Sequence, residues 1–413
     1  MSDSRTPTGA SAATAAGPPR FGVNYVPSQG WWYSWLDWQP SAVAADLRAI
    51  AGLGMDHIRI HCLWPVFQPN PGHISPTALD RLDELMHIAD RCGLDVCVTV
   101  LNGWLSGFSF RPAWLHENVN MFADPGAVAA QLDLMTAMAE RIGTHPRFLG
   151  FDIANEPNVL CHFKGNAITR EQGDAWTRRL LDHCATLAPG RLHVAGFDHE
   201  PWLTDAAPFS RDVLAGTGAA TPVHAWIEFT GALARYGHPA TGTRHLTEYL
   251  LELARAHQTG PERPLWLQEF GAAPQWMPAA DIPGFAEASV DAALTCDHLW
   301  GITWWASHDI DRGLTGFADL EYELGLLTTG NRPKPAGQRL AALVARLRDR
   351  PPRPVARTTA LVLDGTRAPD WAFADRFFAL VDAGTHPAIV LAGRLDEPGH
   401  LEGRGITHVI DRR

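Results

Sequence analysis

Residues 148–157 read FLGFDIANEP, a nearly continuous apolar run that ends in Asn155, Glu156 and Pro157. Such a run is typical of a parallel strand that is covered on both faces by other elements. Asn155 and Glu156 fall where the strand ends, and in barrels of parallel strands that end carries the functional residues. The segment therefore predicts a buried parallel strand with two polar side chains at its carboxyl end.

Seven other short apolar runs share this character, and most of the segments between them show helical spacing of apolar residues. The expected strands cover residues 21–26, 57–62, 95–101, 148–154, 191–197, 222–226, 264–269 and 300–305. The expected helices cover residues 41–53, 76–92, 126–142, 169–187, 243–258, 284–297 and 333–348, with only a short apolar turn near 209–215 between the fifth and sixth strands. This alternation predicts an α/β fold, a (β/α)8 TIM barrel whose active site lies in the loops after the strands.

The chain of 413 residues divides into three parts. Residues 1–20 are rich in Ala, Ser, Thr and Pro and are expected to form a disordered tail, and residues 21–349 form the catalytic barrel. A proline-rich linker opens the last part, residues 350–413, which has the pattern of strand, helix, strand and strand. A piece of this size buries too little surface to fold comfortably alone, so we expect a small α/β appendage packed on the barrel.

Composition excludes several classes of function. The 34 Lys and Arg residues against 45 Asp and Glu residues give a net charge of −11, which argues against nucleic acid or an anionic membrane as a partner. No apolar run is long enough to span a bilayer and the N-terminal residues lack a signal-peptide pattern, so we expect a cytoplasmic protein. The six cysteines form no CxxC pair and the histidines form no HExxH motif, so neither a metal site nor a cofactor is predicted.

Arg59 lies inside the apolar run HIRIHC at residues 57–62. A barrel covers this strand on both faces, and a buried guanidinium without a partner is too costly to keep. We therefore expect a carboxylate to lie beside Arg59 at the mouth of the barrel.

Two glutamates end predicted strands, Glu156 on the fourth and Glu269 on the seventh. Two carboxylates that face each other across a barrel mouth are the groups that hydrolyse glycosides, and a separation of ~5–5.5 Å gives retention of configuration. Arg59 would keep Glu269 ionised as the nucleophile, while Glu156 would hold a proton as the acid and base. Asn155, next to Glu156, is expected to bind the 2-hydroxyl of the sugar.

Tryptophans mark the same face of the predicted barrel. Twelve of the 16 fall at the carboxyl ends of expected strands or in the loops that follow them: Trp31, Trp32, Trp35, Trp38, Trp64, Trp104, Trp114, Trp202, Trp226, Trp276, Trp304 and Trp305. Flat indole rings pack on the apolar faces of sugars, so this pattern indicates a small neutral carbohydrate as the ligand. We expect Trp305 to form the floor of the site and Glu200 to bind a hydroxyl. Of Trp31, Trp32 and Trp35 in loop 27–40, one or two are expected to reach the sugar, with Trp32 as the candidate, while the others pack the loop.

These residues resemble glycoside hydrolase family 5, a family of retaining (β/α)8 enzymes, over about residues 21–345. The resemblance rests on Arg59, the Asn155-Glu156-Pro157 motif, His224, Glu269 with Phe270-Gly271, and Trp305. It implies that Glu156 is the acid and base, that Glu269 is the nucleophile, and that the other residues surround the sugar.

The chain departs from the usual pattern of this family at two positions. Where the family usually has His-x-Tyr in the sixth strand, this chain has His224, Ala225 and Trp226, and Asn102 replaces a histidine often found after the third strand. We therefore expect Trp226 and Asn102 to lie at the substrate in their place.

The opening segment FGVNYVPSQGWWYSW, residues 21–35, is similar to bacterial β-mannosidases of subfamily 18. That similarity implies an exo-β-mannosidase for a small β-mannoside such as Manβ1-4GlcNAc, the unit found in N-glycan cores. A cytoplasmic enzyme would meet imported oligosaccharides rather than polymers, and loops 27–40, 103–122 and 198–220 would close a cleft into a pocket, as exo action needs.

The sequence leaves alternatives open. Within the family, a β-glucosidase or an endo-β-1,4-mannanase has the same pair of carboxylates. From other classes, a carbohydrate-binding barrel without catalysis remains possible in principle, and a metal-dependent hydrolase is disfavoured because His224 has no second histidine beside it. Arg59 could form a purely structural ion pair and His224 could be a core histidine, and the oligomeric state is not predicted.

Overall fold

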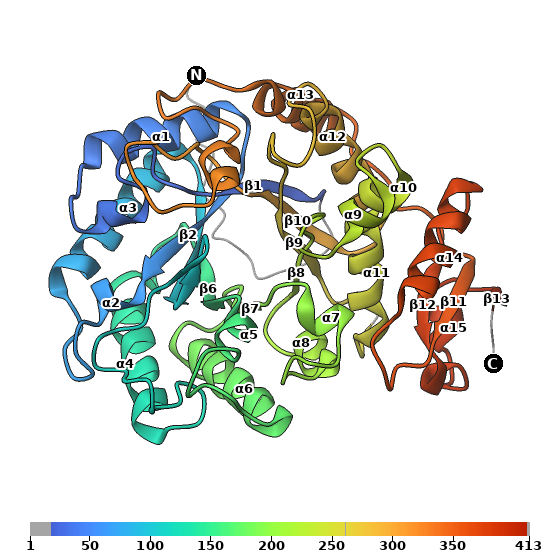
Figure 1. Cartoon of the computed structure of the whole chain (residues 1–413), viewed down its shortest axis with the longest axis horizontal. Coiled ribbons are helices and arrows are strands. Elements are labelled where there is room, and N and C mark those ends of the chain that lie inside the picture. The colour runs from blue at the N-terminus through green and yellow to red at the C-terminus, as the bar shows by residue number, and fades with distance from the viewer. Residues whose placement is uncertain (1–17, 261, 411–413) are drawn as a thin grey trace, which may run out of the picture.

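The computed structural model describes residues 18–260 and 262–410. Eight strands form one parallel sheet: β1 (Arg20–Asn24), β2 (His57–Leu63), β3 (Asp95–Asn102), β6 (Phe148–Asn155), β7 (Val194–Gly196), β8 (Thr221–His224), β9 (Leu265–Phe270) and β10 (Leu299–Trp304). Their order around the sheet is β7-β6-β3-β2-β1-β10-β9-β8, and β7 and β8 contact each other to bring the two edges together. Figure 1 shows the strands inside a ring of helices. The prediction of a (β/α)8 barrel is confirmed, with each strand near its expected range.

The outer ring consists of α1 (Pro40–Gly52), α3 (Pro76–Cys92), α4 (Pro125–Ile142), α6 (Arg170–Leu187), α8 (Arg211–Gly216), α11 (Leu246–His257), α12 (Ile282–Ala293) and α13 (Pro335–Asp349). Three of these helices begin where the sequence supplies a side-chain cap: Ser75 accepts a hydrogen bond from Ala78 N, Asp124 from Ala127 N, and Thr169 from Gln172 N. The short α8 occupies the link between β7 and β8, where the sequence predicts only a turn.

Short elements fill the loops after the strands. They are η1 (Trp31–Trp35), α2 (Trp64–Phe67), β4 (Trp104–Leu105), β5 (Phe108–Ser109), α5 (Pro157–Leu160), α7 (Glu200–Leu203), α9 (Ala232–Tyr236), α10 (Thr241–Arg244) and η2 (Asp319–Glu323). Strands β4 and β5 pair as an antiparallel hairpin after β3, and η2 follows β10.

The C-terminal part is a second, three-stranded parallel sheet of order β12-β11-β13. It comprises β11 (Thr359–Leu363), α14 (Trp371–Asp382), β12 (Ala388–Leu391), η3 (Ala392–Arg394), α15 (His400–Gly403) and β13 (His408–Ile410). Figure 1 shows these elements on the outside of the barrel next to α11. Of the expected N-terminal tail, residues 1–17 lie outside the described residues, and Arg20 already begins β1.

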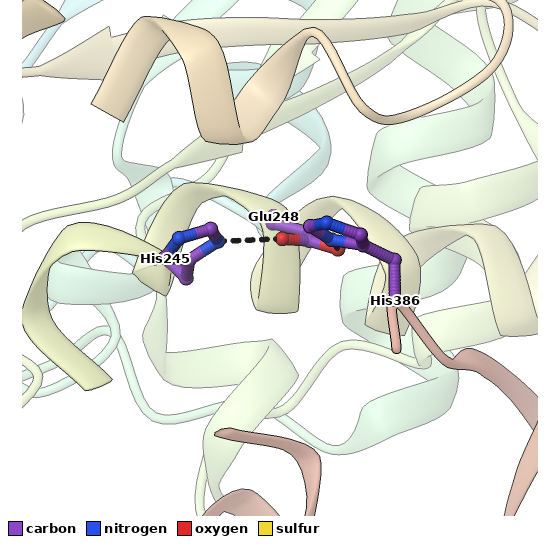
Figure 2. Close-up of side chains that lie close together, drawn as sticks. All are labelled: His245, Glu248 and His386. Carbon is purple, nitrogen blue, oxygen red and sulfur yellow. Dashed lines mark hydrogen bonds and ion pairs between the residues drawn. The ribbon is translucent and has the colours of Figure 1, made fainter. Parts of the chain in front are cut away.

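A buried charge network joins the C-terminal part to the barrel (Figure 2). The carboxylate of Glu248 on α11 lies 2.7 Å from Nδ1 of His245 and 2.8 Å from Nδ1 of His386, and Arg357 donates to it at 2.8 Å. Burial alone would raise the pKa of Glu248, but the two histidine hydrogen bonds and the Arg357 charge hold it well below its ordinary value. Since Arg357 and His386 belong to the C-terminal part, these contacts fasten it to the barrel.

Candidate active site

A cavity of about 310 Å³ opens among the loops at the carboxyl ends of the strands. Its walls come from the carboxyl ends of β6 and β9 and from the loops after β3, β6, β7, β8 and β10, and many of the lining side chains are aromatic or aliphatic. The lining residues are Trp104, Ser106, Gly107, Asn155, Glu156, Val159, Asp198, His199, Trp226, Phe229, Glu269, Trp305, Ala318, Leu320, Glu321 and Leu324.

Arg59 of β2 holds the polar groups of the site in position. Its Nε donates to Asp152 at 2.8 Å, one terminal nitrogen donates to Asn155 at 2.8 Å, and the other donates to Asn24 at 3.0 Å and to Glu269 Oε1. The guanidinium is fully buried, so its charge is balanced by these two carboxylates rather than by water. The carboxylate expected beside Arg59 is therefore present, and Asp152 is a second one that the sequence analysis missed.

Glu269 ends β9 with both carboxylate oxygens in contact with the protein. Oε1 pairs with Arg59, while Oε2 accepts a hydrogen bond from Nε1 of Trp226 at 3.3 Å and lies 3.5 Å from Nδ1 of His224. A cation and two ring nitrogens thus surround a carboxylate that faces the cavity.

Glu156 follows the last residue of β6 and adopts a left-handed backbone conformation, with φ of 44°. Its amide donates to the carbonyl of Gly196 at 2.7 Å, and its Oε1 lies 2.8 Å from Nδ1 of His224. Burial and the negative charge of Glu269 raise the pKa of Glu156 to about 7, although the hydrogen bond from His224 opposes the shift. A carboxyl group with this pKa can hold a proton near neutral pH.

The two glutamates lie close enough to act on one atom. An oxygen of Glu156, an oxygen of Glu269 and a ring nitrogen of His224 all lie within 4.8 Å of one another. This distance is close to the ~5–5.5 Å carboxyl separation of retaining glycosidases and well below the ~6.5–9.5 Å of inverting ones. The geometry therefore suits a double displacement.

The same three groups could in principle ligate a metal ion. A dication there would lie beside the Arg59 guanidinium, which already pairs with Glu269 and would repel it. The cluster of His245, Glu248 and His386 is equally unsuited to a cation, because its carboxylate already pairs with Arg357. Both clusters fit hydrogen-bonded charge networks better than cation sites.

Comparisons with known proteins identify the family. The sequence model described as Cellulase (glycosyl hydrolase family 5) matches residues 17–175. A GH5_18 structure from Streptomyces cattleya, a variant in complex with Manβ1-4GlcNAc, is 44% identical, with 95% of this chain and 98% of that chain covered and a TM-score of 0.91. The chain belongs to glycoside hydrolase family 5.

Two further members of subfamily 18 are similar to this family 5 hydrolase. The structure from Bifidobacterium longum subsp. infantis is 32% identical, with 95% and 96% of the two chains covered and a TM-score of 0.91. A variant from Bifidobacterium longum subsp. longum ATCC 55813, in complex with Manβ1-4GlcNAc, is 34% identical, with 95% of each chain covered and a TM-score of 0.88. A comparison with proteins of curated function gives no match.

Seven of the ten predicted site residues come together in this glycoside hydrolase. Asn155, Glu156, Trp226, Glu269 and Trp305 line the cavity, and Arg59 and His224 contact its carboxylates. Asn155 has protein partners at both ends of its amide, since Oδ1 accepts from Arg59 and Nδ2 donates to the Trp104 carbonyl at 2.9 Å.

Three predicted residues do not line the cavity of this family 5 enzyme. Asn102 is fully buried, with Oδ1 against His61 and Nδ2 bonded to two backbone carbonyls. Trp32 packs against Tyr25, Trp35 and His61 inside the loop after β1. Glu200 contacts His162 and Asn158 and lines a neighbouring cavity of about 370 Å³. Asn102 joins strands β2 and β3, whereas Trp32 and Glu200 contact other parts of the loops, so the structure does not place these three side chains at the cavity.

The sequence analysis missed other groups of this site. Asp152 stood in the apolar run of β6, and the need of Arg59 for partners could have identified it. Gln268, beside Glu269, contacts Nε2 of His224 at 3.0 Å. Glu321 and Ser106 lie in loops after β10 and β3, where no strand pattern indicates which residues turn toward the cavity.

Proposed function

We propose that this family 5 enzyme is a retaining exo-β-mannosidase that removes the mannose of Manβ1-4GlcNAc. The observation that carries the proposal is the Manβ1-4GlcNAc bound to the Streptomyces cattleya relative, which is 44% identical over 95% of this chain. The Bifidobacterium longum relative in complex with the same disaccharide supports it independently. A β-glucosidase or an endo-mannanase finds no comparable support.

In the first half of the reaction, Glu269 acts as the nucleophile. Its carboxylate, paired with Arg59, attacks C1 of mannose while the bond from C1 to the O4 of GlcNAc breaks. Glu156, with its pKa raised to about 7, gives its proton to that oxygen, so that GlcNAc leaves neutral. The product of this half is a mannosyl ester of Glu269 and a free sugar.

In the second half, Glu156 acts as a base. It takes a proton from water, the water oxygen attacks C1, and the ester bond to Glu269 breaks with release of β-mannose. Glu156 is then protonated again and Glu269 is again a carboxylate. His224 contacts both carboxylates and so holds the two groups in register during both steps.

The cavity supports the proposal that one terminal sugar is removed. Its volume of about 310 Å³ suits a small saccharide, and the loops after β3 and β10 close its sides. Trp226 and Trp305 supply flat apolar faces beside Glu269.

Two experiments test the proposal. Wild-type enzyme should cleave p-nitrophenyl β-mannoside and Manβ1-4GlcNAc far faster than p-nitrophenyl β-glucoside, whereas rapid depolymerisation of mannan would contradict exo action. Glu269→Ala should abolish turnover, and azide should restore release of p-nitrophenol by attacking C1 in place of the missing carboxylate to give an α-mannosyl azide. Unchanged activity of Glu269→Ala would exclude Glu269 as the nucleophile.

We further propose that the disaccharide derives from N-glycan cores and that the enzyme acts in the cytoplasm on this small neutral carbohydrate. No helix among residues 18–260 and 262–410 is both long and apolar enough to cross a membrane. Cell fractionation, together with growth of the source organism on N-glycan fragments, tests both points.

A further inference from the structure

A second polar pair lines the cavity, apart from the proposed catalytic groups. Glu321 lies on η2 after β10, and Ser106 lies at the turn between β4 and β5. Oε2 of Glu321 and Oγ of Ser106 are both buried, and apart from the Ser106 hydroxyl that acts on the Glu321 carboxylate, neither atom has a hydrogen-bond partner among the described residues. The mechanism above uses neither side chain.

A buried carboxylate oxygen that meets at most one neutral hydroxyl is costly, because the protein removes it from water and returns fewer hydrogen bonds than water would. A purely structural acid would have a donor from the protein, as Asp152 has in Arg59 and the Gly196 amide. The cavity that Glu321 lines also includes the apolar side chains of Leu320 and Leu324 and three indole rings. A ligand with hydroxyl groups would supply the missing donors.

The position of η2 places Glu321 on the side of the nucleophile. Leu324, directly after η2, accepts hydrogen bonds from the amide of Ala306 at 3.1 Å and from Nε1 of Trp304 at 3.0 Å. These contacts tie η2 to the end of β10, next to Trp305. Burial raises the pKa of Glu321 to about 7, although the hydrogen bond from Ser106 opposes the shift, and the charge of Glu269 adds to the rise more than that of Glu156.

We propose that Glu321, assisted by Ser106, binds hydroxyl groups of the mannose ring in the subsite next to Glu269, and so helps to select the sugar that is cleaved. This inference rests on the proposed function. A carboxylate accepts strong hydrogen bonds from hydroxyls, and in a cavity closed to water each such bond contributes to both binding and specificity.

The test compares Glu321→Ala and Glu321→Gln with wild type, using Glu323→Gln as a matched control. Glu323 lies on the same turn, but its carboxylate pairs with Arg312 and does not line the cavity. Substrates are p-nitrophenyl β-mannoside, Manβ1-4GlcNAc, and aryl β-mannosides that each lack one hydroxyl. Thermal melting checks the fold, and the near-isosteric Gln variant keeps the test valid where the Ala variant is unstable.

Glu321→Ala should lower kcat/KM about tenfold to a hundredfold, and equally for the aryl mannoside and the disaccharide, because the loss lies in the mannose subsite. Glu321→Gln should lose less, since its amide oxygen still accepts a hydrogen bond, and Glu323→Gln should behave as wild type. In wild type, removing a hydroxyl that Glu321 binds should lower kcat/KM. In Glu321→Ala, removing the same hydroxyl should cause no further loss of kcat/KM, because its partner is already absent.

The inference would be overturned if every deoxy-mannoside lost as much kcat/KM, relative to the full mannoside, in Glu321→Ala as in wild type. A loss restricted to the disaccharide would also overturn it, because Glu321 would then contact the leaving sugar. Both of these outcomes differ from failure of the proposed function. In that case the wild-type enzyme itself would not cleave β-mannosides.

Discussion

Nδ1 of His224 lies 2.8 Å from Oε1 of Glu156. The other ring nitrogen, Nε2, lies 3.0 Å from Oε1 of Gln268. Burial lowers the pKa of His224, but the charges of Glu269 and Glu156 outweigh this and raise it. His224 and Glu156 therefore share the proton that the proposed leaving-group step requires.

This relationship predicts a pH dependence. Glu156 must hold a proton to act as an acid, so kcat/KM should fall as the pH rises through about 7, the pKa of Glu156. His224→Ala removes a hydrogen bond that lowers this pKa, so the basic limb of the profile should move to higher pH while kcat decreases. A basic limb that stays in place or moves to lower pH would contradict the assignment.

The close packing around Gly196, at the end of β7, leads to a prediction about activity. A Cβ atom at this position would lie 2.7 Å from both Asp152 Oδ2 and Gln268 Oε1 and 3.0 Å from Arg59. Gly196→Ala should therefore displace the Arg59 network and lower kcat/KM about a hundredfold, as small displacements of catalytic groups do. Gly216→Ala is the control, because a Cβ there meets nothing within 4 Å, and equal activities of the two variants would contradict this account.

The hydrogen bond from Trp226 to Glu269 leads to a prediction about activity. Its Nε1 donates to Glu269 Oε2 at 3.3 Å, and Trp226→Phe keeps an aromatic ring but removes that donor. A hydrogen bond to a charged group contributes about 1.5–3 kcal/mol, so kcat/KM should fall about tenfold to a hundredfold. Trp276→Phe, which changes a ring packed edge-on against Trp226, should have a much smaller effect. If Trp276→Phe lowered kcat/KM more than Trp226→Phe does, ring packing rather than the hydrogen bond to Glu269 would account for the effect.

The network around Glu248 predicts the stability of the chain. Its pKa is lower in the folded protein than in the unfolded chain, so it contributes stability above its unfolded pKa of about 4.3, and that stability is lost as the pH falls. Glu248→Gln leaves Arg357 without this partner and should lower the free energy of unfolding by about 3 kcal/mol at neutral pH.

Denaturant unfolding between pH 3 and 7 measures this effect. The difference between wild type and Glu248→Gln should shrink toward acidic pH, because below the unfolded pKa the unfolded wild-type chain takes up a proton on Glu248, which favours unfolding. Glu140→Gln, which changes an exposed residue of α4, should track wild type at every pH. A difference that grows on acidification would contradict the network.

The barrel was predictable because its strands are buried on both faces and so appear as short apolar runs, as in β6. Arg59 and Glu269 were predictable for the same reason, since a charged residue in or at the end of such a run needs a partner or a function. The loops were not. Trp32 and Glu200 have the chemistry of sugar ligands, but their orientation depends on contacts with distant residues such as His61 and His162.

Glu321 shows the converse limit. Nothing near it in the sequence distinguishes it from Asp319 or Glu323, whose carboxylates pair with Arg312. Hydrogen bonds from distant residues, among them those of Leu324 to the end of β10, bring this turn to the cavity. A carboxylate in a loop can therefore be assigned to the site from three-dimensional packing but not from local pattern.

Labelling with 2-deoxy-2-fluoro-β-mannosyl fluoride tests the central claim most directly, because a retaining enzyme traps this reagent as a stable ester of its nucleophile. We predict time-dependent inactivation, with the fluoromannosyl group on the peptide that contains Glu269. A label on Glu156, or inactivation-free turnover that releases α-mannose first, would contradict the proposed roles of the two carboxylates.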